Sequence, residues 1–439
     1  MNLKYLLPLL TILTFFVIPN KAIEPEKINY FLEKTGLQKT DFHLNEAKNG
    51  NYHITNLDDK RDLFVLWRKM LLKITNKFQP ILHHMNWKEG KVQDSQRLDQ
   101  FPCSLNDTRS PVRPVTVHQL RPGDIDVVAA IGDSLTAGNG AMSATALGAY
   151  TEFRGMSFSG GGMENWSTML TLPNILKVFN PSLYGYATEN VLARDKGAYL
   201  NVAEPMTLSR DLVFQVQVLI QRMRRDSRID MKNHWKLVTI FVGSNDFCTD
   251  MCHHDNMLLF LKNHEEDLYK ALTVLRNNVP HLVVNLIPAP NMVYLQQQME
   301  NVPGFCKIPL GFTCSCLVNR FYSPEYLQKA SELITHWQAI DEQVASLAEF
   351  QTDDFAVLYH SFMANMTIPK LLHGGTDLRY FGKDCVHFSQ FGHAAMANLL
   401  WNNMLQENRR GDVELKPPFD RFECPKAERP FIATMKNKY

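Results

Sequence analysis

The sequence has almost no net charge, no internal repeat and no long apolar run after its first residues. It contains 46 lysines and arginines against 45 aspartates and glutamates, a formal charge of +1. Since nucleic-acid binding relies on an excess of basic side chains, this balance argues against a nucleic-acid partner. The missing repeats and low-complexity segments exclude solenoid architectures, and 45% hydrophobic residues exclude wholesale disorder.

One apolar run is present, at residues 5–18, after Lys4 and before the small residue Ala22. The run is short for a bilayer span and has the pattern of a secretory signal, although an uncleaved anchor is the alternative. We therefore expect residues 1–22 to be a signal peptide. The expected location is outside the cell or in the lumen of the secretory pathway.

The cysteine content agrees with an oxidising compartment. All eight cysteines follow the apolar run: Cys103, Cys248, Cys252, Cys306, Cys314, Cys316, Cys385 and Cys424. We expect disulfides, whose pairing the sequence leaves open. Cys248 and Cys252, with His253 beside them, also fit a zinc site. No second ligand cluster follows at a matching spacing, so we expect no metal site. Glycosylation sequons occur at Asn106, Asn165 and Asn365.

Apolar runs alternate with helical patterns after residue 126. The candidate strands are residues 127–131, 199–202, 237–242, 282–287 and 355–358, and the clearest helices are residues 212–223, 257–275 and 324–350. This alternation predicts an α/β fold, a three-layer α/β/α sandwich with a mainly parallel five-stranded sheet. We expect it to occupy residues 111–437. We expect residues 23–110 to form a helical segment before or against it. An amphipathic pattern at residues 63–74 fits packing on the domain better than lying on a membrane.

A glycine-rich stretch with a serine follows the first candidate strand. Gly132, Asp133 and Ser134 come directly after this apolar run, at the start of a predicted short helix. Backbone N–H groups point outward at such a position, which suits a nucleophile whose attack creates an oxyanion. The simpler alternative is a serine that only caps the helix.

Two further strands are followed by polar residues of catalytic type. Asn245 and Asp246 follow residues 237–242, and Asp384 and His387 follow the last strand. An amide can donate to an oxyanion, and an aspartate three residues before a histidine can orient its imidazole. Each pattern alone is also common in turns, where Asn and Asp side chains form hydrogen bonds with the backbone. Their order, with each placed after an apolar strand, favours catalysis. We expect His393, in the following helix, to be structural.

Together these blocks resemble the GDSL (SGNH) hydrolases, and more closely the animal phospholipase B branch of that family. The resemblance covers roughly residues 100–437, and the supporting stretches lie at residues 120–125, 150–162, 171–176, 201–204, 401–405, 424–425 and 434–437. It implies a flavodoxin-like three-layer fold and esterase chemistry on phospholipids. It also implies that Ser134 is the nucleophile, His387 the general base and Asp384 its orienting acid. Asp246 is the rival for the acid's role.

The resemblance further implies an oxyanion hole with three donors. They are the Ser134 N–H, the Asn245 amide and a backbone N–H after the second strand. The family usually has a glycine at this last position, whereas this chain has Met206, for which a positive φ is costly. We take Met206 as the third donor, with Gly162 in the run of residues 160–162 as the alternative.

The sequence therefore predicts a secreted serine ester hydrolase. The expected substrates are glycerophospholipids and lysophospholipids, cleaved through an acyl-serine intermediate without a cofactor, by a monomer in transient contact with a lipid surface. Two alternatives stay open at this point. One is an esterase for small or carbohydrate esters, and the other is a lipid-binding protein with impaired catalysis, suggested by Met206.

Overall fold

The computed structural model describes residues 61–95, 98–299, 301–318, 322–406 and 413–437. The chain divides into two compact units, Met1–Met70 and Leu71–Tyr439, and the boundary lies within helix α3 (Arg61–Lys77). The signal peptide predicted for residues 1–22 lies outside the described residues. The predicted limits of the helical segment 23–110 and of the domain 111–437 stay predictions. No helix in the described ranges combines the length and apolar character needed to cross a bilayer.

A parallel sheet forms the centre of the second unit. It contains β1 (Ile125–Gly132), β2 (Trp235–Phe241), β3 (Leu282–Ile287) and β4 (Phe355–Tyr359), in that order and all parallel. Every residue of β2 and β3 is buried, which is why these strands are mainly apolar and show no regular alternation of apolar and polar residues. Four of the five expected strands are therefore confirmed, together with the α/β class.

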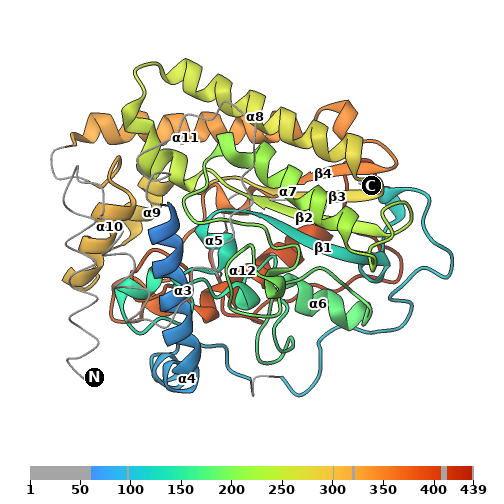
Figure 1. Ribbon diagram of the computed structural model, residues 1–439, viewed down its shortest axis with the longest axis horizontal. Helices are drawn as coiled ribbons and strands as arrows, with labels where there is room; N and C mark the ends of the chain where they lie inside the picture. Colours follow the sequence, from blue (N-terminus) through green and yellow to red (C-terminus); the bar gives the residue numbers. More distant parts are fainter. Residues whose placement is uncertain (1–60, 96–97, 300, 319–321, 407–412, 438–439) are drawn as a thin grey trace. The chain divides into compact units, whose positions relative to one another are not determined.

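Helices cover both faces of this sheet (Figure 1). One face carries α7 (Leu212–Arg225), α8 (Met257–Asn278) and α11 (Pro324–Ala345), and the other carries α5 (Ser134–Ala137), α6 (Leu172–Phe179) and α12 (Gln390–Leu405). The remaining described α-helices are α4 (Gln79–Lys88), α9 (Met292–Gln298) and α10 (Lys307–Thr313). The three-layer prediction is confirmed.

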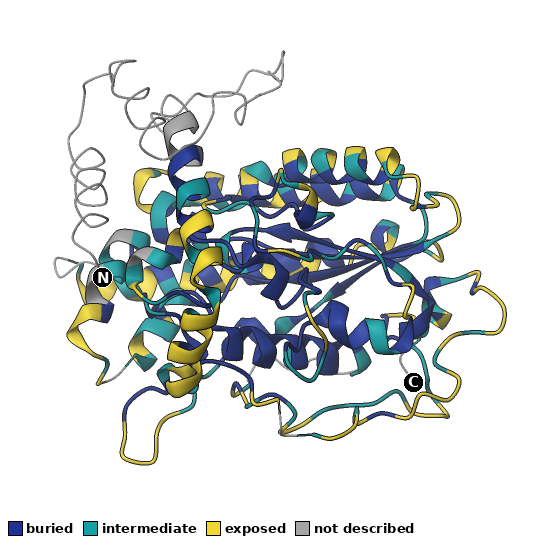
Figure 2. Ribbon diagram, turned by 60° about the horizontal axis from the view of Figure 1, so that its bottom comes forward, coloured by how far each residue is buried: buried dark blue, intermediate teal, exposed yellow. Residues whose placement is uncertain are grey.

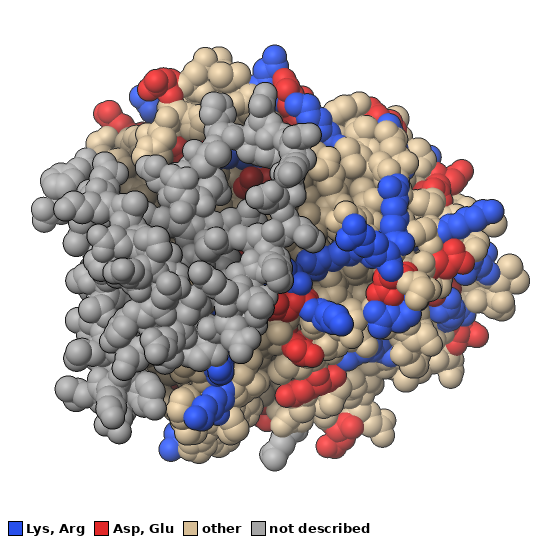
Figure 3. All heavy atoms as spheres, viewed as in Figure 1, with Lys and Arg blue, Asp and Glu red and all other residues tan. Residues whose placement is uncertain are grey.

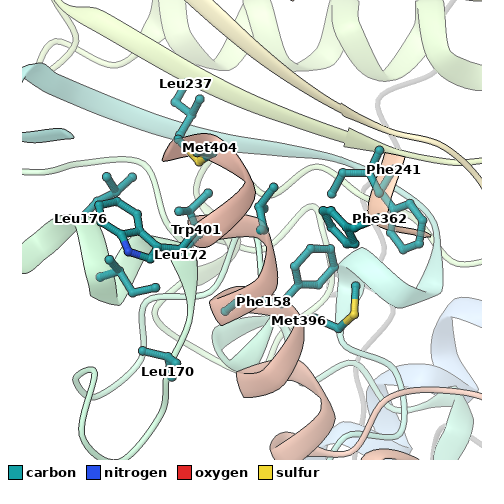
Figure 4. Close-up of a cluster of buried hydrophobic side chains, with 14 of the residues drawn as sticks. Phe158, Leu170, Leu172, Leu176, Leu237, Phe241, Phe362, Met396, Trp401 and Met404 are labelled. Atoms are coloured by element: carbon teal, nitrogen blue, oxygen red, sulfur yellow. The ribbon is translucent and has the colours of Figure 1, made fainter. Parts of the chain in front are cut away.

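Successive residues of β1 enter different hydrophobic clusters, as strand geometry requires. Val127 and Ala129 pack with α7 and α8, whereas Val128 packs with α6 and α12. Met396, Trp401 and Met404 of α12 point into this second cluster (Figure 4). The strands and α12 are almost entirely buried, and exposed residues lie on the outer helices and loops (Figure 2). On the visible part of the face in Figure 3, basic and acidic side chains are interspersed.

The predicted strand at residues 199–202 is wrong, because this segment makes only isolated bridges. Ala130 N–H donates to Leu200 O at 3.1 Å and Ala130 O accepts from Val202 N–H at 2.9 Å, so the segment runs along the outer edge of β1. Tyr199 has a left-handed φ of 47°, which breaks the extended geometry. Leu200 N–H instead donates to Gly185 O. The fifth position of the sheet is thus filled by irregular chain.

Buried Arg154 holds this irregular edge in place. Its guanidinium donates to Ala203 O at 2.7 Å, to Asn201 Oδ1 at 3.0 Å and to Val191 O at 3.1 Å. It also pairs with Glu152, and both side chains are fully buried. These contacts replace part of the strand ladder that the segment lacks.

All eight cysteines form disulfides, which confirms the general prediction and settles the pairing. The pairs are Cys103–Cys424, Cys248–Cys314, Cys252–Cys316 and Cys306–Cys385. Cys248 and Cys252 therefore have no thiolate to offer a metal ion. The asparagines of the three sequons are exposed, and their glycosylation stays a prediction.

We predict that Glu152→Gln lowers the free energy of unfolding by about 3 kcal/mol, because it leaves the Arg154 charge buried without a counter-charge. The measurement is a urea titration followed by circular dichroism. The matched control is Glu266→Gln, which removes the exposed Glu266–Lys270 pair and should cost less than about 1 kcal/mol. Equal effects of the two substitutions would contradict the assigned role of Arg154.

Candidate active site

Ser134 is the first residue of α5 and lies directly beyond the end of β1. The turn requires a glycine at 132, since a Cβ there would lie 2.4 Å from Thr136 Oγ1 and 2.5 Å from Phe241 O. The Asp133 carboxylate caps the helix by accepting the Leu135 N–H at 2.8 Å. Ser134 is half-buried and its N–H, the first of the helix, has no partner within it.

The structure brings Ser134, His387 and Asp384 into one row. Ser134 Oγ lies 2.8 Å from His387 Nε2, and His387 Nδ1 lies 2.5 Å from Asp384 Oδ2. Asp384 is 1% exposed and His387 is 8% exposed, so the carboxylate is shielded from water while the serine stays accessible. A nucleophile, a base and a group that orients the base are the arrangement that acyl transfer requires.

The loop that carries Asp384 and His387 is held by its own backbone and by a disulfide. Asp384 Oδ1 accepts the N–H groups of Val386 and His387 at 3.2 Å each, and Gly382 N–H donates to His387 O at 2.7 Å. Cys385 adopts a left-handed φ of 61° and is bonded to Cys306. The loop therefore has few alternative conformations.

The electrostatics of the row favour a charged imidazole. Burial lowers the pKa of His387, but the Asp384 charge, the hydrogen bond to Asp384 and the Asp133 charge together raise it above its usual value. Burial also raises the pKa of Asp133 to about 6. His393 lies in α12, as expected, where burial and then the His387 charge lower its pKa to about 3. His393 Nδ1 accepts the Phe158 N–H, away from the row.

Met206 and Asn245 lie on adjoining segments beside Ser134. Asn245 Nδ2 donates to Thr207 O at 3.0 Å, and Glu204 N–H donates to Gly132 O at 3.1 Å. The second bond ties residues 204–207, which we call the Met206 loop, to the end of β1. Met206 has a φ of 67°, the conformation that favours glycine. Its N–H has no acceptor among the described residues, and its side chain is 47% exposed.

The glycine run at residues 160–162 does not offer a free donor. Gly162 N–H donates to Ala187 O at 2.8 Å, and Gly161 N–H donates to Ser157 O at 2.9 Å. Gly160 N–H donates to Ser157 Oγ at 3.4 Å. The geometry thus favours Met206 over Gly162 as a donor.

Gln215 of α7 supports the site, and the sequence patterns did not identify it as a functional residue. Its side chain accepts the Gly132 N–H and donates to Gly132 O, both at 2.9 Å, and it also donates to Thr207 Oγ1 at 2.7 Å. One amide thus joins the end of β1 to the Met206 loop. Its position within an apolar helical face, where a polar residue needs partners, was the available signal.

A second serine, histidine and aspartate lie in a row behind this loop. Ser209 Oγ is 2.6 Å from His264 Nδ1, and His264 Nε2 is 2.9 Å from Asp341 Oδ1. These three side chains are at most 3% exposed, and the Trp337 ring stacks on His264 at 3.5 Å. A substrate cannot reach Ser209, so this row supports the loop.

Asp246, the alternative candidate for the catalytic acid, contacts Ser209 of this second row. Its carboxylate accepts the Ser209 N–H at 3.1 Å, and burial holds its pKa well above the usual range. Asp384, by contrast, contacts His387 directly. The structure therefore places Asp384 in the row with Ser134, and Asp246 beneath the Met206 loop.

We predict that Met206→Gly keeps the protein as stable as the wild type, within about 1 kcal/mol, because relief of the left-handed strain offsets the added chain entropy. Met206→Ala is the control at the same position, since it loses the side chain but keeps the strain. Thermal unfolding should place Met206→Ala below Met206→Gly. The reverse order would contradict the strained conformation.

Comparison with known proteins is consistent with this site. Residues 128–400 match the model of the GDSL-like lipase/acylhydrolase family. Similar proteins are the membrane-associated phospholipases B1 of Homo sapiens, Mus musculus and Rattus norvegicus, with 32%, 33% and 34% identity over 95%, 88% and 95% of this chain. The chain covers 29%, 27% and 30% of those proteins, less than a third of their length. Since the family model matches more than half of the sequence, the chain belongs to the GDSL-like lipase/acylhydrolase family.

Proposed function

We propose that this protein hydrolyses the acyl esters of glycerophospholipids and lysophospholipids through an acyl-Ser134 intermediate. The observation that carries the proposal is the row of Ser134, His387 and Asp384, with hydrogen bonds of 2.8 and 2.5 Å. Family membership and the phospholipase B1 names of the relatives support the substrate class.

In the first step, Ser134 Oγ attacks the ester carbonyl carbon while His387 Nε2 accepts the hydroxyl proton. The negative charge on the former carbonyl oxygen is stabilised by the N–H groups of Ser134 and Met206 and by the second N–H of the Asn245 amide. Asp384 holds the ring orientation and stabilises the imidazolium. The carbon–oxygen bond to the alcohol then breaks, and the alcohol leaves with the proton from His387.

In the second step, water gives a proton to His387 and its oxygen attacks the acyl ester on Ser134. The same donors stabilise the oxyanion, and its collapse returns the proton to Ser134 Oγ and releases the fatty acid. All of these groups belong to the protein, so the proposed reaction needs no cofactor. We expect activity to persist in the presence of a chelator.

The surroundings of the row fit a substrate with long acyl chains. Met206 and Tyr150 are exposed apolar residues on the loops next to the site. Tyr150 is 39% exposed, and burial of the rest of its side chain, followed by the charge of Asp384, raises its pKa. Exposed apolar side chains beside a nucleophile favour a lipid over a small carbohydrate ester. The row and the free donors argue against impaired catalysis.

Secretion, a monomeric state and transient contact with a lipid surface belong to the same proposal. The disulfides support an oxidising compartment. The even mixture of charges on the visible surface in Figure 3 gives no support for a nucleic-acid partner.

We predict that the wild type releases fatty acid from phosphatidylcholine and lysophosphatidylcholine micelles in chelator, and that Ser134→Ala reduces this release by at least about 10³-fold. Release is measured by mass spectrometry of the free acids. Ser209→Ala is the matched control and should retain the ability to turn over substrate. Release that survives in Ser134→Ala would contradict the proposal, and release only from short soluble esters would favour the small-ester alternative.

We predict that kcat/KM for a soluble ester falls on acidification with a pKa above 6.5. His387 must be neutral to accept the serine proton, and its raised pKa keeps it protonated to a higher pH. Asp384→Asn removes the charge that raises this pKa, so the acid limb should move to lower pH while the rate falls.

Asp133→Asn is the control for the pH profile, since Asp133 has a pKa of about 6 and asparagine preserves its cap. An acid limb that disappears in this variant would assign the titration to Asp133 instead of His387. A limb at or below 6.5 in the wild type would contradict the raised pKa.

A further inference from the structure

An exposed stretch before the domain combines apolar and basic side chains. Five large apolar residues of this stretch are 40–58% exposed: Ile74, Phe78, Ile81, Met85 and Trp87. Five basic side chains are also exposed: Lys73, Lys77, His83, His84 and Lys88. Residues 71–88 contain no aspartate or glutamate. We call these ten side chains the α4 surface.

The composition of the α4 surface differs from that of an ordinary exposed helix. Another exposed helix of this chain, α8, mixes acidic and basic residues. On α4, Asn86 points inward and donates to Leu82 O at 2.9 Å and to Met142 O at 3.3 Å. The apolar side chains of the α4 surface are exposed instead, and their exposure costs free energy in water.

The α4 surface is joined directly to the loops that flank His387. Lys91, three residues after α4, donates to Phe381 O at 2.5 Å and to Leu378 O at 2.6 Å. Lys91 O accepts the Phe391 N–H at 2.9 Å. Glu89 pairs with Lys383, the residue before Asp384. A ligand bound to the α4 surface would thus lie close to the loop that carries Asp384 and His387.

We propose that the α4 surface docks on the surface of anionic phospholipid aggregates and brings them to Ser134. Apolar residues with interspersed Lys and His, and no acid, match the acyl and headgroup layers of such a surface in polarity and charge. Tryptophan favours this boundary because its ring is apolar and its N–H is polar. The inference rests on the proposed function for its biological meaning, but the docking can be tested without catalysis.

The test uses the full chain with Ser134→Ala, so that the lipid is not consumed. Binding to sonicated vesicles of phosphatidylcholine with phosphatidylserine is measured by co-sedimentation. The double change Ile81→Ser and Trp87→Ser should lower the partition coefficient by on the order of tenfold or more. The matched control changes Leu258 and Leu259 to Ser, exposed apolar residues at the start of α8, and should leave binding unaltered.

Tryptophan fluorescence gives a second readout. Trp87 is 57% exposed, whereas the other five tryptophans of the chain are buried or half-buried. Vesicles should therefore shift the emission to shorter wavelength through Trp87. Trp87→Phe should remove the shift and keep the binding. Vesicles of phosphatidylcholine alone, or high salt, should weaken binding because the lysines lose their partners.

In the Ser134-containing enzyme, the same double change should lower the hydrolysis of vesicle phospholipid and leave that of a short soluble ester unaltered. Equal vesicle binding by the double variant and its parent would overturn the docking proposal. A change of oligomeric state on substitution, seen by sedimentation velocity, would overturn it in favour of a second copy of the chain. Absence of all ester hydrolysis with intact vesicle binding would contradict the proposed function alone.

Discussion

The hydrogen bond between Ser134 Oγ and His387 Nε2 joins residues 253 positions apart, and the site depends on it. On one side, β1 is buried on both faces and delivers the serine through a turn that only glycine at 132 permits. On the other side, Asp384 and the Cys306–Cys385 disulfide fix the loop of His387. Because a general base must lie within hydrogen-bond reach of its proton, both supports must hold at once.

The Met206 loop is supported from below in a similar way. Gln215 binds both polar groups of Gly132 and also Thr207, while the Ser209–His264–Asp341 row and Asp246 anchor the next turn. A backbone N–H aimed at an oxyanion is useful only if it does not have to move during the reaction. This preorganisation allows a methionine with a φ of 67° to occupy a position where glycine is favoured.

Much of the architecture could be predicted from local patterns. The strands β2 to β4 are mainly apolar without regular alternation, and the helices between them have clear periodicity, so the α/β class and the layers followed. The placement of Ser134, Asn245 and His387 at one edge followed from parallel strand direction. The catalytic roles themselves stay predictions.

The features that could not be predicted depend on contacts between residues far apart in the sequence. Residues 199–202 look like a strand, but Tyr199 turns left-handed and Arg154 binds the carbonyl groups instead. The disulfide pairs and the partners of Asp246 are set by tertiary packing, which no local pattern contains. The contact between Asp384 and His387 could be predicted because the two residues are only three positions apart in the sequence.

The most direct test of the account is the site of covalent labelling by a fluorophosphonate, located by peptide mass spectrometry of the folded protein. The part of the chain that the structure describes contains two rows of serine, histidine and aspartate, and we assign reactivity to the half-buried Ser134 and none to the buried Ser209. We predict one adduct, on the peptide that contains Ser134. An adduct on Ser209, or none on Ser134, would contradict it.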